Sequence, residues 1–291
     1  MRVTKAVIPA AGLGTRMLPA SKAIPKEMIP IVDKPAIQYI VEEAVAAGIR
    51  DILIILSRGK TVVEDHFDRS PELEKRLLES GKEELCRQMT DIAGAARIHY
   101  VRQQEMLGLG HAVAQARAFV GDEPFAVLYG DDVVIGEVSA TAELCAAYEK
   151  YGLGVAGIKP VPVEQLTRYS SLRVEAWQDG CCRITDMIEK PRPGEEFSNY
   201  SILGRCVLPP KIFDILDRTP RGAGGEIQLT DAMRELTLTD GMIGVEYSGT
   251  RCDMGNKLAY LQACVEQALR HPEIGGEFTA YLKQLAKGLC V

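Results

Sequence analysis

Apolar and polar positions follow two periodic patterns along this chain. Short apolar runs of strand length are followed by stretches in which apolar residues recur every three or four positions, as on one face of a helix. In the stretch 60–92, for example, Leu73, Leu77 and Leu78 are expected to share one face. The repetition predicts an α/β fold whose mainly parallel sheet carries helices on both faces. The expected strands of this first part are 3–9, 51–56, 98–101, 125–129 and 153–158, and the expected helices are 35–45, 60–92, 111–120 and 139–151.

The pattern of apolar and polar positions changes after about residue 170. Three runs there are shorter and alternate apolar with polar positions, which is typical of antiparallel strands with one exposed face. A further strand is expected at 242–247. The antiparallel runs are 173–176, 183–188 and 200–207, and the later helices are expected at 209–217, 226–236, 255–270 and 276–289. No low-complexity linker divides the chain, so we expect one α/β domain with a mixed, mainly parallel sheet.

The composition restricts the kinds of molecule that we expect this protein to bind. The chain has 291 residues, 46% of them hydrophobic, and a net charge of −6, whereas a nucleic-acid-binding protein usually has a basic face. No apolar run reaches the ~18 residues of a membrane span, and the short apolar N-terminus does not have the form of a signal peptide. The eight cysteines contain no C-x-x-C pair and are expected to be reduced thiols. We therefore expect a cytoplasmic protein without nucleic-acid or membrane partners.

The first candidate site is a glycine-rich turn, residues 10–16, which follows the first apolar run. Small residues there would let backbone N–H groups approach a phosphate, and Arg16 and Lys26 would neutralise it. A purely steric turn is the alternative. A dinucleotide fingerprint is disfavoured because Met17 occupies its third glycine position, and Met17-Leu18-Pro19 replaces the Gly-Lys-Ser/Thr of a P-loop.

Two acidic motifs follow expected strands. Asp131 and Asp132 come after the run at 125–129, where a carboxylate at the end of a strand can hold Mg²⁺ against phosphates. Because neighbouring residues in extended chain point to opposite sides, we expect only one of the two to face a ligand. Asp253 precedes the helix at 255–270 and is a second candidate. The structural alternatives are an ordinary turn for the first motif and a helix cap for the second.

Two further motifs have the chemistry of substrate recognition. Glu189 can accept hydrogen bonds from sugar hydroxyls, and Lys190 can bind a phosphate. The amide of Gln103 matches the edge of a pyrimidine, and Gly108 would let a base lie against the backbone. The structural alternatives are an exposed charged turn for Glu189 and Lys190 and a simple loop for the segment with Gln103 and Gly108. His111 is expected to be a surface or helix-end residue rather than a catalytic base.

Together, and in this order, these blocks resemble one family, the bacterial UTP–glucose-1-phosphate uridylyltransferases, also called UDP-glucose pyrophosphorylases. The runs 21–28 and 226–232 are specific to that family, whereas the glycine-rich turn is shared with the wider sugar nucleotidyltransferase superfamily. The chain departs from many members at Ser170, where they have a glycine that helps to form the sugar pocket. The matching stretches are 10–17, 21–28, 33–35, 108–112, 189–191, 225–232 and 253–256.

The resemblance implies a Rossmann-like nucleotide-diphospho-sugar transferase fold and the reaction of UTP with glucose 1-phosphate to give UDP-glucose and pyrophosphate. It implies in-line attack on the α-phosphorus without a covalent intermediate, and a Mg²⁺ cofactor. It assigns the nucleoside to the backbone of Ala10, Ala11 and Gly12, the uracil to Gln103 and Gly108, and the triphosphate to Arg16 and Lys26. Gly14 is a further expected substrate-binding residue. It assigns Mg²⁺ to Asp131 and Asp253, the glucose to Glu189 and Ser170, and the sugar phosphate to Lys190.

The same resemblance divides the single domain, residues 1–291, into a nucleotide-binding part at 1–160, a sugar-binding part at 161–254 and C-terminal helices at 255–291. It also implies a homodimer or homotetramer, with the C-terminal helices as candidate oligomerisation elements. Two rival functions stay open. A thymidylyltransferase of the same fold would present the same residues, because uracil and thymine share the edge that Gln103 would bind. A regulatory protein without catalysis is the other rival.

Overall fold

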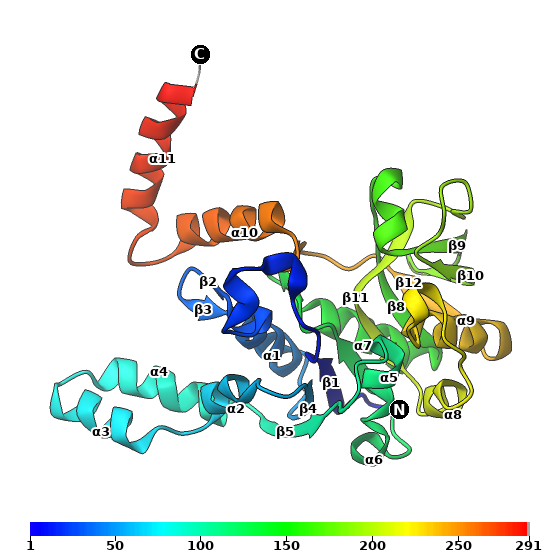
Figure 1. Cartoon of the computed structure of the whole chain (residues 1–291), viewed down its shortest axis with the longest axis horizontal. Helices are drawn as coiled ribbons and strands as arrows, with labels where there is room; N and C mark the ends of the chain where they lie inside the picture. Colours follow the sequence, from blue (N-terminus) through cyan, green and yellow to red (C-terminus); the bar gives the residue numbers. More distant parts are fainter. Residues whose placement is uncertain (290–291) are drawn as a thin grey trace.

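A nine-stranded sheet forms the centre of the molecule, in the strand order β5-β4-β1-β6-β11-β8-β12-β10-β9 (Figure 1). The structure is a computed structural model and describes residues 1–289. Among these nine strands, β10 and β11 run opposite to the others, so the predicted mixed, mainly parallel sheet is confirmed. The strands are β1 (Lys5–Pro9), β4 (Asp51–Leu56), β5 (Arg97–Arg102), β6 (Phe125–Leu128), β8 (Gly154–Pro160), β9 (Ser170–Ala176), β10 (Cys182–Glu189), β11 (Tyr200–Leu208) and β12 (Met242–Val245).

Helices cover both faces of this sheet, as predicted. Along β1, Ala6 and Ile8 pack into an apolar cluster with α1 and α7, whereas Val7 points into a second cluster with α5, α8 and α9. This alternation is what a strand buried on both faces requires. The helices are α1 (Ala36–Ala46), α2 (Thr61–Phe67), α3 (Pro71–Glu79), α4 (Glu83–Gly94), α5 (Leu109–Ala114), α6 (Arg117–Val120), α7 (Ala140–Tyr151), α8 (Ile212–Leu216), α9 (Leu229–Thr239), α10 (Lys257–Arg270) and α11 (Gly275–Leu289).

Two predicted helices are wrong in detail. The stretch 60–92 forms α2, α3 and α4, and of its predicted apolar face only Leu77 is buried, while Leu73 and Leu78 are 44% and 54% exposed. The reason is that α3 and α4 form a hairpin that extends from the main body, so α3 has little besides α4 to pack against (Figure 1). The predicted helix at 111–120 is split into α5 and α6. At the end of α5, Ala116 N donates to Val113 O, three residues earlier, and this tighter 3₁₀-type turn ends the helix.

The sequence pattern also missed two short antiparallel ribbons. One joins β2 (Pro30–Ile31) to β3 (Lys34–Pro35), and the other joins β7 (Asp132–Ile135) to β13 (Thr250–Asp253). In the second ribbon Asp132 lies directly opposite Asp253. Each strand has only four residues, and the charged residues Asp132, Arg251 and Asp253 interrupt the apolar pattern. The ribbon nevertheless brings the two acidic motifs of the sequence together.

Two expectations from composition concern the whole chain. Among the described residues, none of the helices has both the length and the apolar character that a bilayer crossing requires. The described cysteines are free thiols, and Cys290 lies outside the described residues. Cys252, which is adjacent to a candidate site residue, is 5% exposed, and burial raises the pKa of its thiol to about 11. A buried thiol with so high a pKa behaves as a small apolar residue.

Candidate active site

A cleft of about 1280 Å³ lies at the carboxyl ends of β1 and β6 and extends toward the end of β10. This is where open α/β sheets usually bind ligands. It brings together residues that are far apart in the sequence. The predicted site residues that line it are Ala11, Gly12, Gly14, Arg16, Lys26, Gln103, Gly108, Asp131, Ser170, Glu189, Lys190 and Asp253.

Ala10 is the exception among the predicted residues, because it is 1% exposed and does not line the cleft. Its N–H donates to Ile55 O at 2.8 Å, and its carbonyl accepts a hydrogen bond from Lys60 Nζ. Both backbone groups of Ala10 are therefore already paired within the protein. This placement does not support the predicted backbone contact of Ala10 with a nucleoside.

Two carboxylates flank a single guanidinium in the centre of the cleft. Arg16 Nη1 lies 3.3 Å from Asp253 Oδ2, and Arg16 Nη2 lies 3.6 Å from Asp131 Oδ2. Lys26 Nζ is 2.5 Å from the same Asp131 oxygen. The guanidinium also packs flat on Gly255, where a Cβ would lie 2.5 Å from its Cζ. Glycine at 255 thus leaves the space in which Arg16 reaches both acids.

The charges of Lys26 and Asp131 stabilise each other. Burial disfavours the charged form of Asp131, but Lys26 and Arg16 more than compensate and hold the pKa of its carboxyl below the usual value. Burial likewise opposes the charge on Lys26, and Asp131 nevertheless raises the pKa of the ammonium. Both groups are therefore charged near neutral pH, as a site for a metal ion and phosphates requires.

Asp132 faces a different cation from Asp131. Its Oδ1 lies 2.6 Å from Arg251 Nη2, whose guanidinium stacks 4.8 Å from the ring centroid of Tyr169. The Tyr169 hydroxyl in turn donates to Asp253 at 3.1 Å. Burial raises the pKa of Asp132 to about 6. The two neighbouring acids therefore point to different partners, as expected for extended chain, but both of them line the cleft.

The donor set at Asp131 and Asp253 fits a hard divalent cation. Both supply carboxylate oxygens, which magnesium prefers, and magnesium usually combines one or two such groups with water and phosphate oxygens. Within residues 1–289 no group of three or more His, Cys, Asp or Glu side chains gathers in a metal-binding arrangement. Two carboxylates are nevertheless enough for a cation that a phosphate also binds.

The part of the cleft that contains Gln103 is bordered by the segment at 226–227. Gln103 is 4% exposed, and its Nε2 donates to Gly108 O at 3.1 Å and lies 2.9 Å from His111 Nδ1. Gly108 has φ +110°, and a Cβ there would lie 2.7 Å from Glu226 Cβ and from Ile227 O. Glycine is thus required here by the segment at 226–227, besides any room that it leaves for a base.

Another part of the cleft, at the end of β10, contains Glu189 and Lys190. Thr230 Oγ1 donates to Glu189 Oε2 at 2.7 Å, and burial raises the pKa of this carboxyl above its ordinary value. Lys190 is exposed and has φ +48°, with its N–H bonded to Tyr169 O. Ser170 Oγ accepts from Ile202 N at 3.0 Å. The serine hydroxyl is thereby held against β11, which limits the bulk that it adds to the pocket.

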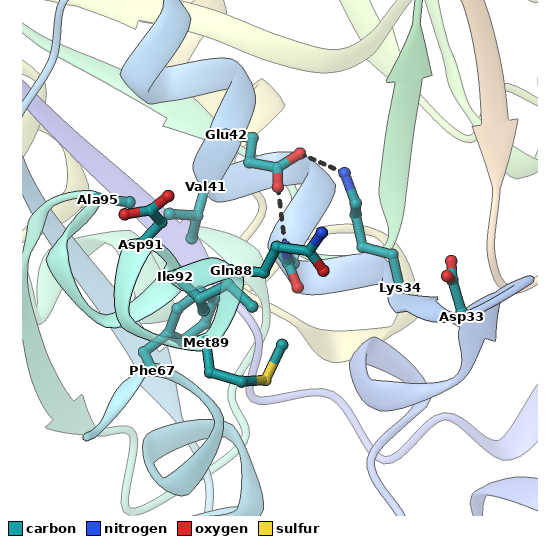
Figure 2. A pocket seen from close by; sticks show the side chains of 11 residues that line it. Asp33, Lys34, Val41, Glu42, Phe67, Gln88, Met89, Asp91, Ile92 and Ala95 are labelled. Carbon is teal, nitrogen blue, oxygen red and sulfur yellow. Dashed lines mark hydrogen bonds and ion pairs between the residues drawn. The ribbon is translucent and has the colours of Figure 1, made fainter. Parts of the chain in front are cut away.

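A second cavity, of about 400 Å³, lies between α1, α4 and the β2–β3 hairpin (Figure 2). Three of its polar residues are paired with one another. Glu42 accepts from Lys34 Nζ and from Gln38 Nε2, both at 2.8 Å. None of the predicted site residues lines this cavity. The larger cleft is therefore the candidate active site.

Comparison with known proteins identifies the family. The nucleotidyl transferase family matches residues 5–268 of this chain. A UTP–glucose-1-phosphate uridylyltransferase of Bacillus subtilis (strain 168) is 51% identical over 286 residues, which cover 98% of this chain and 96% of the relative. The chain belongs to the bacterial UTP–glucose-1-phosphate uridylyltransferases. The resemblance drawn from the sequence blocks is thus confirmed.

Solved structures agree with this family assignment. A UTP-bound UGPase from Acinetobacter baumannii has a TM-score of 0.90 at 39% identity, covering 97% of this chain and 99% of that one. A UDP-glucose pyrophosphorylase complexed with UDP-glucose has a TM-score of 0.85 at 39% identity, covering 92% of this chain and all of that one. The predicted Rossmann-like α/β architecture is therefore the architecture of the uridylyltransferases.

Sequence reasoning singled out none of three residues that contact the candidate site residues. Arg251 lies two positions before Asp253, and it pairs with Asp132. Thr230 was part of a family-specific run, and its bond to Glu189 joins segments 41 positions apart. Lys60 follows Gly59 in the turn between β4 and α2, where a lysine is usually an exposed loop residue. These contacts link segments that are distant in sequence, so no local pattern could have revealed them.

Proposed function

We propose that this uridylyltransferase family member transfers the uridylyl group of UTP to glucose 1-phosphate, giving UDP-glucose and pyrophosphate. The observation that carries the proposal is the central arrangement of the cleft, in which Arg16 lies between Asp131 and Asp253 with Lys26 alongside. Alternating cations and carboxylates suit a reaction between two polyanions and a divalent cation. A sequence relationship of 51% identity to a uridylyltransferase supports the same reaction.

In the proposed reaction, a phosphate oxygen of glucose 1-phosphate attacks the α-phosphorus of UTP in line. The new O–Pα bond forms as the bond from Pα to the oxygen that bridges to the β-phosphorus breaks, and that oxygen leaves with its electron pair on pyrophosphate. The attacking phosphate is already an anion near neutral pH, because its second pKa is about 6. No general base and no covalent intermediate are therefore required.

The residues of the nucleotide side would bind and screen the triphosphate. Arg16 and Lys26 would contact the phosphates that leave as pyrophosphate, exchanging part of their present contacts with Asp131 for phosphate oxygens. Asp131 and Asp253 would hold Mg²⁺. When bound there, Mg²⁺ supplies charge neutralisation and orientation of the phosphate oxygens. Backbone N–H groups of the turn at 11–14 would contact the nucleotide.

Recognition of the base and of the sugar phosphate would occur at the two ends of the cleft. Gln103 and Gly108 would bind the uracil edge, with the Gln103 amide turning from Gly108 O toward the base. Glu189 would accept hydrogen bonds from glucose hydroxyls, and the backbone of Ser170 would line the sugar pocket. Lys190 would pair with the phosphate of the sugar phosphate. Positioning of the two substrates would then provide much of the rate.

We further propose that the protein is a homodimer or homotetramer joined through its C-terminal helices. Apolar residues line one exposed stripe of α10 and continue on α11, which extends from the main body (Figure 1). Exposed apolar stripes of this kind mark interaction sites. Light scattering should give a multiple of the chain mass for the native protein and a smaller mass for Leu258→Glu/Leu261→Glu. The stripe consists of Leu258, Leu261, Val265, Leu269, Tyr281 and Leu285.

Pyrophosphate release from purified protein with glucose 1-phosphate and Mg²⁺ tests the reaction, with UTP, dTTP, CTP, ATP and GTP compared side by side. Release that needs both substrates and is fastest with UTP is the expected result. Preference for dTTP would make the protein a thymidylyltransferase with the same mechanism. Binding of UTP without any release would make it a regulatory protein, and absence of nucleotide binding would contradict both readings.

A further inference from the structure

Lys60 is a buried lysine whose ammonium lies behind the glycine-rich turn. The residue is 7% exposed and does not line the cleft. Its Nζ donates to Ala10 O at 2.5 Å, to Gly12 O at 2.8 Å and to Glu27 Oε2 at 2.8 Å. An ammonium has three donors and no acceptor, so all of its hydrogen-bonding capacity is used within the protein. Lys60 therefore has no donor left for a substrate.

The two carbonyls that Lys60 binds determine where the neighbouring amides point. A trans peptide bond directs its C=O and its N–H to opposite sides, and the peptides that follow Ala10 and Gly12 are trans. Because Lys60 holds both carbonyls on the buried side, the N–H groups of Ala11 and Leu13 face away from it. Both of these residues line the cleft.

The third partner of Lys60 connects it to the cationic part of the site. Glu27 is 1% exposed and follows Lys26 in the short 3₁₀ helix η3 (Lys26–Met28). The two neighbours face opposite ways, Lys26 toward Asp131 in the cleft and Glu27 toward Lys60 behind it. Burial raises the pKa of Glu27 and lowers that of Lys60, and each of the two groups favours the charged form of the other.

We infer that Lys60 is a positioning residue for nucleotide binding: its ammonium clamps the glycine-rich turn to η3, turning the Ala11 and Leu13 amides toward the nucleotide phosphates and fixing Lys26. The inference rests on the proposed function, which supplies the nucleotide. Lys60 acts through the groups that it holds, because three acceptors saturate it and it does not line the cleft. Loss of the clamp would leave the amides and Lys26 in place only part of the time.

The test compares Lys60→Met with Lys5→Met. Lys5 is a matched control at the other end of β1, where its Nζ also bonds a carbonyl, Val120 O at 3.0 Å, and a carboxylate, Glu123 at 2.8 Å. We expect Lys60→Met to lower kcat by about 10²-fold, the order of loss that a misplacement of about 1 Å causes, and to weaken UTP binding in calorimetry at least about tenfold. Lys5→Met should leave both quantities unchanged.

The double variant Lys60→Met/Glu27→Gln separates positioning from simple charge balance. It contains no unpaired buried charge, so it should fold even where Lys60→Met alone does not, as its Tm will report. If Lys60 positions the amides, this double variant still binds UTP weakly and turns over slowly. Native UTP affinity and turnover in the folded double variant would overturn the inference. A native protein that fails to turn over UTP would instead overturn the proposed function.

Discussion

The nucleotide side and the sugar side of the cleft differ in how their charges are held. On the nucleotide side, each cation already contacts a carboxylate: Lys26 contacts Asp131, and Arg16 contacts both Asp131 and Asp253. On the sugar side, Lys190 is exposed, and within the described part of the chain its Nζ has no carboxylate partner. Glu189 is held there by a neutral hydroxyl, that of Thr230.

The same chemical task, binding a phosphate, is thus met in two ways. Charges that are fixed in advance need little reorganisation when a transition state forms, but each must give up part of a carboxylate contact as a phosphate arrives. An exposed lysine loses no such contact, and it must lose water and side-chain freedom instead. Substitutions on the nucleotide side should therefore disturb both the fold and the rate, and those on the sugar side mainly the rate.

The largest effect is expected for Asp131→Asn, on the nucleotide side. The amide cannot hold Mg²⁺ or stabilise the Lys26 ammonium as a carboxylate does, so kcat should fall on the order of 10³-fold at modest Mg²⁺. Pyrophosphate release over a Mg²⁺ titration measures it. Asp122→Asn, an exposed change near the opposite end of the same strand β6, should behave as the native protein. Normal turnover of Asp131→Asn would mean that the metal assignment is wrong.

Lys190→Ala tests the sugar side. Because the lysine is exposed and unpaired with any described carboxylate, its removal should leave Tm unchanged while lowering the rate about 10²–10³-fold, as removal of one charge-stabilising donor does. Steady-state kinetics with varied glucose 1-phosphate, together with a thermal melt, measures both quantities. Arg192→Ala, an exposed change in the same loop, is the matched control. A clear loss of Tm in Lys190→Ala would remove the contrast between the two sides.

The sequence predicted most strands well because a buried strand needs an uninterrupted apolar run, and β4 matches its predicted range, 51–56. It failed where an element has few neighbours or few apolar residues. The α3–α4 hairpin leaves Leu73 and Leu78 exposed, and the β7–β13 ribbon is too short and too charged to have a strand pattern.

The candidate site shows the same limit. The motifs contained most of the residues that line the cleft, because each motif is local. Their pairing is not local: Arg16 and Asp253 are 237 positions apart, and Lys60 and Ala10 are 50 apart. Only the folded chain reveals that Ala10 is buried and does not line the cleft, and that Gly108 makes room for the segment at 226–227.

Gln103→Ala probes the base-binding end and should have a smaller effect. Loss of one neutral hydrogen-bonding side chain should raise KM for UTP by about three- to tenfold while leaving kcat nearly unchanged, because uracil lies away from the reacting phosphorus. The ratio of kcat/KM for UTP to that for CTP should fall as well. The exposed neighbour Gln104→Ala serves as control. An unchanged UTP-to-CTP ratio would argue against contact of Gln103 with the base.

The smallest effect concerns the stability of the nucleotide side and its dependence on pH. Burial raises the pKa of Asp132 to about 6, whereas an unfolded chain has an aspartate pKa of about 3.9. Between these values the folded state binds a proton that the unfolded state does not, so this group's contribution to the free energy of unfolding falls as pH rises from about 4 to 6. Above pH 6 the contribution is constant.

Asp132→Asn removes this titration while retaining the size of the side chain. The difference in Tm, native minus variant, should therefore decrease by a few degrees between pH 4 and 6 and stay level from pH 6 to 8. Thermal melts at closely spaced pH values measure it, and Asp122→Asn should give a level difference throughout. A difference that rises with pH in this window would mean that Arg251 keeps the Asp132 carboxylate ionised. Asp132 would then be a carboxylate that a neighbouring cation holds in its charged form, as Asp131 is.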